Sequence, residues 1–377
     1  MYGEFDDAER FAFFSRAILE IIPHIDFKPD IIHCNDWQTA LTPVYYSTIY
    51  AQRPGYENIK TVFTIHNIQY QGVYGKELID NVIGLDYSNK NLIEYDDAVN
   101  FAKAAIECAN AVSTVSPSYA KEILDPWYSH GLDTILKERS FKLRGILNGI
   151  DVENYNPETD KDVFKNYSSE KMTGKATNKR ELQKFFGLPE KKDTPVMGMV
   201  TRLVSHKGLD LCKAVLDELL ATTDIQLVVL GSGDTEYEDF FRGLASRYPE
   251  QVGLCLGFIP DLARKIYAGS DLFLMPSKSE PCGLSQMVAL RYGTVPIVRE
   301  TGGLRDSITD SGDGQGNGFT FKTYNAHDML GAIRRATDAY WDKDNWDVLV
   351  DRAMNCDFSW GKSANEYIKM YKQVLKD

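Results

Sequence analysis

The sequence predicts an α/β protein of two lobes, each built on a parallel sheet covered by helices. Apolar, β-branched runs alternate along the chain with segments of helical periodicity, which is the pattern of βαβ units. The length of 377 residues exceeds that of a typical single domain. A break at residues 148–151, followed by a polar stretch, separates two sets of these runs. Each set predicts one Rossmann-like lobe, in which ligands bind at the carboxyl ends of the strands.

Nearly continuous apolar runs indicate the strands, because strands of a parallel sheet are covered on both faces. The first lobe, residues 1–148, has predicted strands at 30–34, 61–66, 111–115 and 143–147. The second lobe, residues 149–355, has them at 196–200, 225–230, 253–257, 272–275 and 295–298. Helical patterns lie between the strands, for example at 208–220 and 284–291. The remaining segment, 356–377, carries an amphipathic helical pattern at Tyr367, Met370, Tyr371 and Val374.

Composition excludes several classes of protein. The net charge of −12 argues against general binding of nucleic acid or of anionic membranes, so an anionic ligand needs a local cationic site. No apolar stretch approaches the length of a membrane span, and the first residues lack an apolar secretory segment. The six cysteines have neither zinc nor disulfide spacing. We therefore expect a protein of the reducing cytosol, or of a plastid if the source is a plant.

Two cations follow one predicted strand of the second lobe. Arg202 and Lys207 come directly after the run 196–200, and Gly208 then begins a helical pattern. Single arginines and lysines are usually helix-flanking surface charges. In an acidic chain, however, two cations at a strand end favour a site for an anion such as a diphosphate.

A carboxylate and a turn follow a second strand of the same lobe. Pro281 fixes its own φ and Gly283 permits unusual backbone angles, so the turn would aim Glu280 into a cleft. A helix beginning at Leu284 would leave the N–H groups of Leu284 and Ser285 for phosphate oxygens. An ordinary capped loop is the alternative. Because a carboxylate suits sugar hydroxyls, the cations and this turn together predict a nucleotide-sugar enzyme.

Other strand ends carry weaker signals. Paired glycines in Thr301-Gly302-Gly303 let the backbone approach a ligand closely, although a tight strand-to-helix turn explains them equally well. In the first lobe, Asp36 and His66 each follow a strand. A histidine in such a place can bind a sugar or transfer a proton, although a lone histidine is more often structural.

Taken together, these segments resemble bacterial glycogen synthases and plant starch synthases. The resemblance runs from about Asp7 to the C-terminus. It rests on Asn35-Asp36-Trp37-Gln38, Thr64-Ile65-His66-Asn67, Tyr70-Gln71-Gly72, Thr114-Val115-Ser116-Pro117, Leu147-Asn148-Gly149-Ile150-Asp151, Arg202 with Lys207-Gly208-Leu209-Asp210, Glu280-Pro281-Cys282-Gly283-Leu284, and Thr301-Gly302-Gly303-Leu304.

The resemblance implies a GT-B glycosyltransferase with a cleft between its two lobes. It implies transfer of glucose from ADP-glucose to the non-reducing end of an α-1,4-glucan, with retention at the anomeric carbon. Arg202 and Lys207 would neutralise the leaving diphosphate, and no metal or other cofactor is implied. It also implies that the helix in 356–377 crosses back to the first lobe.

The resemblance assigns further roles by residue. Glu280 would hold glucose hydroxyls, and Asp36 would position the sugar or the acceptor. The remaining candidates would contact the sugar (His66, Asn148), bind phosphate through backbone N–H groups (Leu284, Ser285) or line the donor pocket (Thr301, Gly302, Gly303).

Alternatives concern the donor and the first lobe. Family members carry a Lys-x-Gly-Gly-Leu loop upstream of the region matched by Asp7, so the resemblance implies a first lobe that is truncated at its N-terminus. A nucleotide- or glucan-binding fragment without turnover is therefore one alternative. A GT-B transferase that uses a UDP-sugar is the other, because base selectivity cannot be read from residue types.

Overall fold

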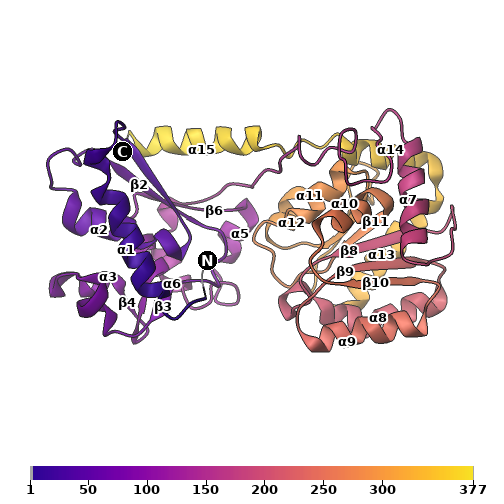
Figure 1. The fold of residues 1–377 in the computed structure, drawn as a ribbon, viewed down its shortest axis with the longest axis horizontal. Helices are drawn as coiled ribbons and strands as arrows, with labels where there is room; N and C mark the ends of the chain where they lie inside the picture. The colour runs from indigo at the N-terminus through magenta and orange to yellow at the C-terminus, as the bar shows by residue number, and fades with distance from the viewer. Residues whose placement is uncertain (1–2, 377) are drawn as a thin grey trace. The chain divides into compact units, whose positions relative to one another are not determined.

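The computed structural model describes residues 3–376, which belong to two compact units (Figure 1). Unit 1 combines Met1–Leu147 with Ser363–Asp377, and unit 2 is Asn148–Lys362. Each unit is built on a parallel sheet with helices, so the predicted α/β architecture is confirmed.

Unit 1 contains all four strands predicted for the first lobe. They pair in parallel in the order β1-β2-β6-β7, with bounds β1 (Ile31–Asn35), β2 (Lys60–Ile65), β6 (Ala111–Thr114) and β7 (Leu143–Gly145). Its helices are α1 (Asp7–Glu20), α2 (Leu41–Tyr45), α3 (Lys90–Ile93), α4 (Phe101–Cys108), α5 (Pro117–Glu122) and α6 (Asp133–Glu138). A small antiparallel sheet, which the sequence did not predict, has the order β3-β5-β4, with bounds β3 (Val73–Tyr74), β4 (Glu94–Tyr95) and β5 (Ala98–Asn100).

The last helix, α15 (Trp360–Val374), packs on the parallel sheet of unit 1 through its C-terminal part. Met370 and Val374 join one apolar cluster with Val62 and other residues of the sheet. Beside this cluster, His33 of β1 lies 2.6 Å from the Tyr371 hydroxyl through Nδ1 and 2.6 Å from Thr64 Oγ1 through Nε2. Burial, with a smaller effect of His66, lowers the pKa of His33 to about 4, so a neutral ring links the helix to the sheet.

Unit 2 contains all five strands predicted for the second lobe and one more. The order is β10-β9-β8-β11-β12-β13, all parallel, with bounds β8 (Val196–Val200), β9 (Gln226–Gly231), β10 (Val252–Leu256), β11 (Leu272–Met275), β12 (Val295–Arg299) and β13 (Phe319–Phe321). Its helices are α7 (Thr173–Phe185), α8 (Leu209–Thr222), α9 (Thr235–Arg247), α10 (Pro260–Gly269), α11 (Ser285–Arg291), α12 (Gly302–Ser307), α13 (Ala326–Trp341) and α14 (Lys343–Met354).

Helices cover both faces of the unit 2 sheet. Leu182 of α7 and Ile266 of α10 pack on one face, in a cluster with Val196 and Val228 of the central strands. Figure 1 shows α8 and α9 on the side of the sheet away from α10 and α11. Because the strands are buried on both faces, their carboxyl ends are the exposed edge at which ligands of such sheets bind.

A half-buried lysine close to the start of α7 directs its ammonium group into unit 2. The Lys175 ammonium donates to the carbonyl oxygens of Tyr292 (2.8 Å) and Ala268 (3.2 Å), and to Thr294 Oγ1 (2.9 Å). Burial is the largest influence on its pKa, which falls from the usual 10.5 to about 7. The unfolded chain therefore binds this proton more tightly than the folded chain does, and stability should rise with pH between these two values.

We predict that replacing Lys175 by Met removes this pH dependence. Between pH 7 and 9, the free energy of unfolding of the wild type should rise relative to that of Lys175→Met by roughly 1 kcal/mol per pH unit. Urea titrations of the full chain at several pH values measure the difference. Lys184→Met, which alters an exposed lysine of the same helix, is the matched control. A constant difference across this range would contradict the prediction.

Candidate active site

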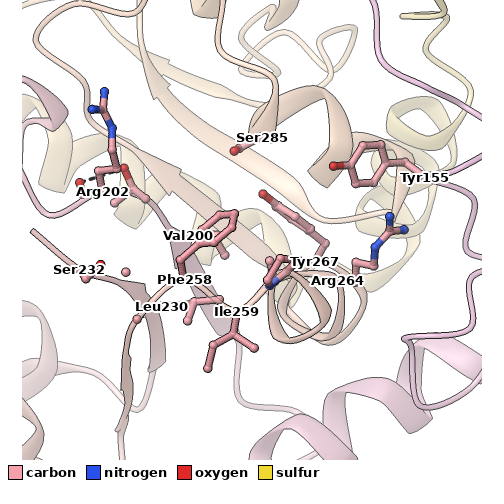
Figure 2. A pocket seen from close by; sticks show the side chains of 15 residues that line it. Tyr155, Val200, Arg202, Leu230, Ser232, Phe258, Ile259, Arg264, Tyr267 and Ser285 are labelled. Atoms are coloured by element: carbon pink, nitrogen blue, oxygen red, sulfur yellow. Dashed lines mark hydrogen bonds between the residues drawn. The ribbon is translucent and has the colours of Figure 1, made fainter. Parts of the chain in front are cut away.

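A cavity of about 560 Å³ lies at the carboxyl ends of three neighbouring strands of unit 2. Val200 ends β8 and Arg202 follows it, Ser232 follows β9, and Phe258 follows β10. The remaining lining residues come from these turns and from three other places: α10, the first residue of α11, and the segment after residue 150. Figure 2 shows Arg202 on one side of the cavity and Tyr155 with Arg264 on the other. The cavity is therefore where a doubly wound sheet is expected to bind its ligand.

The lining of the cavity is mostly apolar and aromatic. Phe258, 90% exposed, and Ile259 stand at the end of β10, and Tyr267 projects from α10 (Figure 2). Polar groups are few, and Arg202 and Ser285 are among them. A flat heteroaromatic ring suits such apolar walls, and an anionic group attached to it suits the arginine.

A network around Arg264 fixes one wall of the cavity. Its Nη1 donates to the Asn154 carbonyl (2.7 Å) and to Asp160 Oδ2 (2.9 Å), and its guanidinium lies 4.7 Å from the centre of the Tyr155 ring. Asp160 is buried and also accepts a hydrogen bond from the Tyr292 hydroxyl. From sequence alone this region is only a polar stretch after the break at residues 148–151, which suggests a linker. The structure corrects that reading, because a buried ion pair holds the segment against α10.

A cation and a carboxylate from the two predicted segments meet beside this cavity. Lys207 Nζ lies 2.7 Å from Glu280 Oε2, and Ser277 Oγ donates to the same oxygen at 2.9 Å. Glu280 is only 7% exposed. Gly208, with φ of 74°, ends the short turn that carries Lys207, and a Cβ there would overlap the Pro276 carbonyl oxygen. The pairing follows from the adjacency of β8 and β11, which the sequence analysis did not predict.

Arg202 is exposed and lies close to a histidine. Its Nη2 is 3.4 Å from His206 Nε2. Burial first, and then the charges of Lys207 and Arg202, lower the pKa of His206. A neutral imidazole can accept a hydrogen bond from the guanidinium without adding a third positive charge. His206 was not among the residues that the sequence singled out, although it lies in the same short turn.

The paired glycines Gly302 and Gly303 contact the backbone of residues 280–284, here called the Glu280 turn. The Gly303 N–H donates to the Glu280 carbonyl oxygen at 3.1 Å, and a Cβ on Gly302 would overlap that oxygen. A Cβ on Gly303 would overlap the carbonyl oxygen of Cys282. Thr301, Gly302 and Gly303 are all buried. The close approach of two backbones thus accounts for both glycines, and their predicted place in the lining of a donor pocket stays a prediction.

Three other predicted residues lie near this turn. Leu284 is the N-cap of α11 and is exposed, and Ser285 is the first residue of the helix, one position later than predicted. The Asn148 side-chain oxygen Oδ1 is buried, with no hydrogen-bond partner among residues 3–376. A buried acceptor without a donor is costly, so a ligand hydroxyl reaching it would be stabilised.

The candidate residues of unit 1 also lie together. Asp36 Oδ1 accepts the His66 backbone N–H at 2.8 Å, and His66 Nε2 lies 2.9 Å from Asn35 Oδ1. Burial is the largest influence on the pKa of the Asp36 carboxyl group and raises it, although the hydrogen bond from the His66 N–H acts to lower it. Asp36 has φ of 56° and ψ of 178°, a conformation that residues other than glycine rarely adopt. Such strain occurs preferentially at functional sites.

The described part of the chain has neither a cluster of metal ligands nor a helix that could span a membrane. Among residues 3–376 there is no group of three or more His, Cys, Asp or Glu side chains placed to hold a metal ion. None of the helices in this part is both long and apolar enough to cross a bilayer.

Comparison with known proteins identifies the family. Residues 1–138 match the starch synthase catalytic domain family, and residues 180–346 match glycosyl transferases group 1. The chain is 51% identical over 379 residues to the glycogen synthase of Desulforamulus reducens, covering 100% of this chain and 79% of that protein. The chain belongs to the glycogen synthase family. A glycogen synthase of Bacillus cereus is 49% identical over 380 residues, with 100% and 80% covered.

Solved structures agree with this membership of the glycogen synthase family. The catalytic domain of starch synthase IV from Arabidopsis thaliana, bound to ADP and acarbose, superposes with a TM-score of 0.91 and 39% identity, covering 100% of this chain and 79% of that one. Sucrose-phosphate synthase from Thermosynechococcus elongatus gives a TM-score of 0.60 at 18% identity over 98% and 80% of the two chains, a likeness of fold alone. The predicted GT-B fold and glycosyltransferase class are therefore confirmed.

Cys282 lies inside the Glu280 turn, and we predict that it is not a nucleophile. The residue is 6% exposed. Burial is the largest influence on the pKa of the thiol and raises it to about 12. The thiolate is the reactive form, so the folded chain should resist alkylation of Cys282 at pH 8, as peptide mass spectrometry can measure. Cys282→Ser should keep glycosyl transfer within about an order of magnitude of the wild type. Rapid modification, or loss of turnover in a folded Cys282→Ser variant, would contradict this.

Proposed function

We propose that the chain transfers glucose from ADP-glucose to the non-reducing end of an α-1,4-glucan, with retention at the anomeric carbon. Membership of the glycogen synthase family supports the reaction, and the ADP and acarbose bound to the Arabidopsis starch synthase support the two ligand classes. The observation that carries the proposal is the cavity of unit 2, which combines apolar walls with Arg202, in the same turn as the lysine of the Lys207–Glu280 pair.

In this proposal the nucleotide occupies the cavity at the carboxyl ends of the strands. The base lies against the aromatic side chains of Phe258 and Tyr267. The diphosphate lies toward Arg202 and the start of α11, where Leu284 and Ser285 would bind phosphate oxygens through backbone N–H groups. This orientation puts the sugar beyond the diphosphate, on the side of Glu280.

The chemical step breaks the bond between the glucose anomeric carbon and the diphosphate oxygen, and that carbon forms a new bond to the 4-hydroxyl oxygen at the non-reducing end of the glucan. The proton of this hydroxyl passes to the leaving diphosphate. The electron pair stays with the diphosphate, which gains negative charge as it leaves. Arg202 and Lys207 stabilise that charge, and they do so most effectively in a site that excludes water. Cys282 takes no part, because its thiol is buried and protonated.

Carboxylate, amide and imidazole groups would bind the sugars. Glu280 accepts hydrogen bonds from glucose hydroxyls, and the unpartnered Oδ1 of Asn148 is a second acceptor. Asp36 and His66, which lie together in unit 1, bind sugar hydroxyls as well. Thr301, Gly302 and Gly303 complete the donor site by supporting the Glu280 turn.

We predict that Lys207→Ala loses most of the transfer activity. Removing one preorganised group that stabilises transition-state charge lowers the rate by about 10²–10³-fold. The measurement is incorporation of labelled glucose from ADP-glucose into glycogen by the full chain. Lys213→Ala is the matched control, since Lys213 is an exposed lysine of α8 whose ammonium pairs with Glu236.

The outcomes separate the alternatives. Loss of transfer in Lys207→Ala, with Lys213→Ala near the wild type, supports the proposal. Equal turnover in the wild type and both variants would show that Lys207 does not stabilise the leaving diphosphate. If the folded wild type incorporates glucose only from UDP-glucose, the donor is wrong. If it binds ADP and transfers glucose from neither donor, the chain is a binding fragment.

A further inference from the structure

A buried glutamine contacts the backbone of the Glu280 turn. Gln286, the second residue of α11, has no solvent exposure. Its Nε2 lies 2.9 Å from the Gly283 carbonyl oxygen, 3.2 Å from that of Cys282, and 3.0 Å from Ser307 Oγ. One amide nitrogen with two hydrogens therefore serves three acceptors, two of them consecutive carbonyls of the turn.

These hydrogen bonds join the turn to α12. The Ser307 hydroxyl, which accepts from Gln286, donates in turn to the Gly303 carbonyl oxygen at 2.6 Å. The N–H of that same Gly303 donates to the Glu280 carbonyl oxygen. Gln286 thus closes a ring of hydrogen bonds around the turn, so that the backbone cannot rotate at one position without breaking a bond elsewhere.

The direction of the two carbonyls decides the direction of two N–H groups. In a trans peptide the C=O and the following N–H point opposite ways, and the described residues contain no cis peptide bond. Because the carbonyls of Cys282 and Gly283 point at Gln286, the N–H groups of Gly283 and Leu284 point away from it. The left-handed φ of 65° at Gly283 permits this arrangement.

The amide oxygen of Gln286, unlike its nitrogen, stabilises no part of the turn through a hydrogen bond. It is buried without a hydrogen-bond partner among residues 3–376, and a Cβ on Gly283 would lie 2.6 Å from it. If this side chain served packing alone, an apolar residue would be more stable here, because an unpartnered buried oxygen is costly. The hydrogen bonds of the nitrogen are therefore what the glutamine supplies.

We infer that Gln286 is a positioning residue of the donor site, which orients the Glu280 turn and the N–H groups of Gly283 and Leu284 toward the diphosphate and the sugar. The inference rests on the proposed function, since it assigns the turn to the nucleotide-sugar. Gln286 itself touches no ligand. Its effect passes through the backbone of residues 280–284, so its loss should impair donor binding and turnover together.

The test replaces Gln286 by Met, which keeps the length of the side chain but has no donor. Misplacing the turn should raise the Kd for ADP and lower kcat/KM for ADP-glucose, each on the order of ten- to a hundredfold. Gln183→Met is the matched control, because Gln183 is a second buried glutamine of unit 2 whose Nε2 donates to Lys191 and Gln226. It should lose thermal stability and keep both constants.

A second variant covers the case in which Gln286→Met does not fold. Ser307→Ala removes the link to α12 alone, so the same two constants should change in the same direction but by less. Wild-type ADP affinity and kcat/KM in a folded Gln286→Met, or in Ser307→Ala if only that variant folds, would overturn the inference. ADP binding is read separately from transfer. A wild type that binds ADP without transferring glucose would therefore refute the proposed reaction and still leave the positioning role measurable.

Discussion

The ion pair between Lys207 and Glu280 is the contact on which the candidate site depends. It joins the turn after β8 to the turn after β11, two strands that are neighbours in the sheet. Glu280 is almost fully buried, so removing either partner would leave the other charge poorly compensated. The position of the first turn is in this way tied to that of the second. Arg202, which precedes Lys207 in the first turn, is placed by the same constraint.

Backbone contacts that only glycine allows extend this constraint to a third strand end. Gly208 lets the Lys207 turn lie against the Pro276 carbonyl, and Gly302 lets α12 lie against the Glu280 carbonyl. The turns after β8, β11 and β12 therefore contact one another through main-chain atoms. Side chains at these two positions would push the turns apart, and the charged groups would move with them.

The sequence predicted what depends on local order along the chain. All nine proposed strands exist, because a strand buried on both faces is visible as a continuous apolar run. The two-residue strands β3 and β4 are too short to show a period. The Arg264–Asp160 pair and the hydrogen bonds of Gln286 could not be predicted either, since both join residues whose proximity only the sheet order and the folded turn determine.

Charge balance explains how a carboxylate would remain beside the proposed diphosphate site in an acidic protein. Lys207 compensates the charge of Glu280, and Arg202 is an exposed cation in the lining of the cavity. A diphosphate bound as proposed would compete with Glu280 for the ammonium of Lys207, and Glu280 would then lose part of its charge compensation. The Ser277 hydroxyl, which donates to the same carboxylate oxygen, remains in place, and sugar hydroxyls can supply the missing donors. The proposed site would therefore favour an anion and a polyol that arrive as one molecule over a free anion, which would leave the carboxylate poorly compensated.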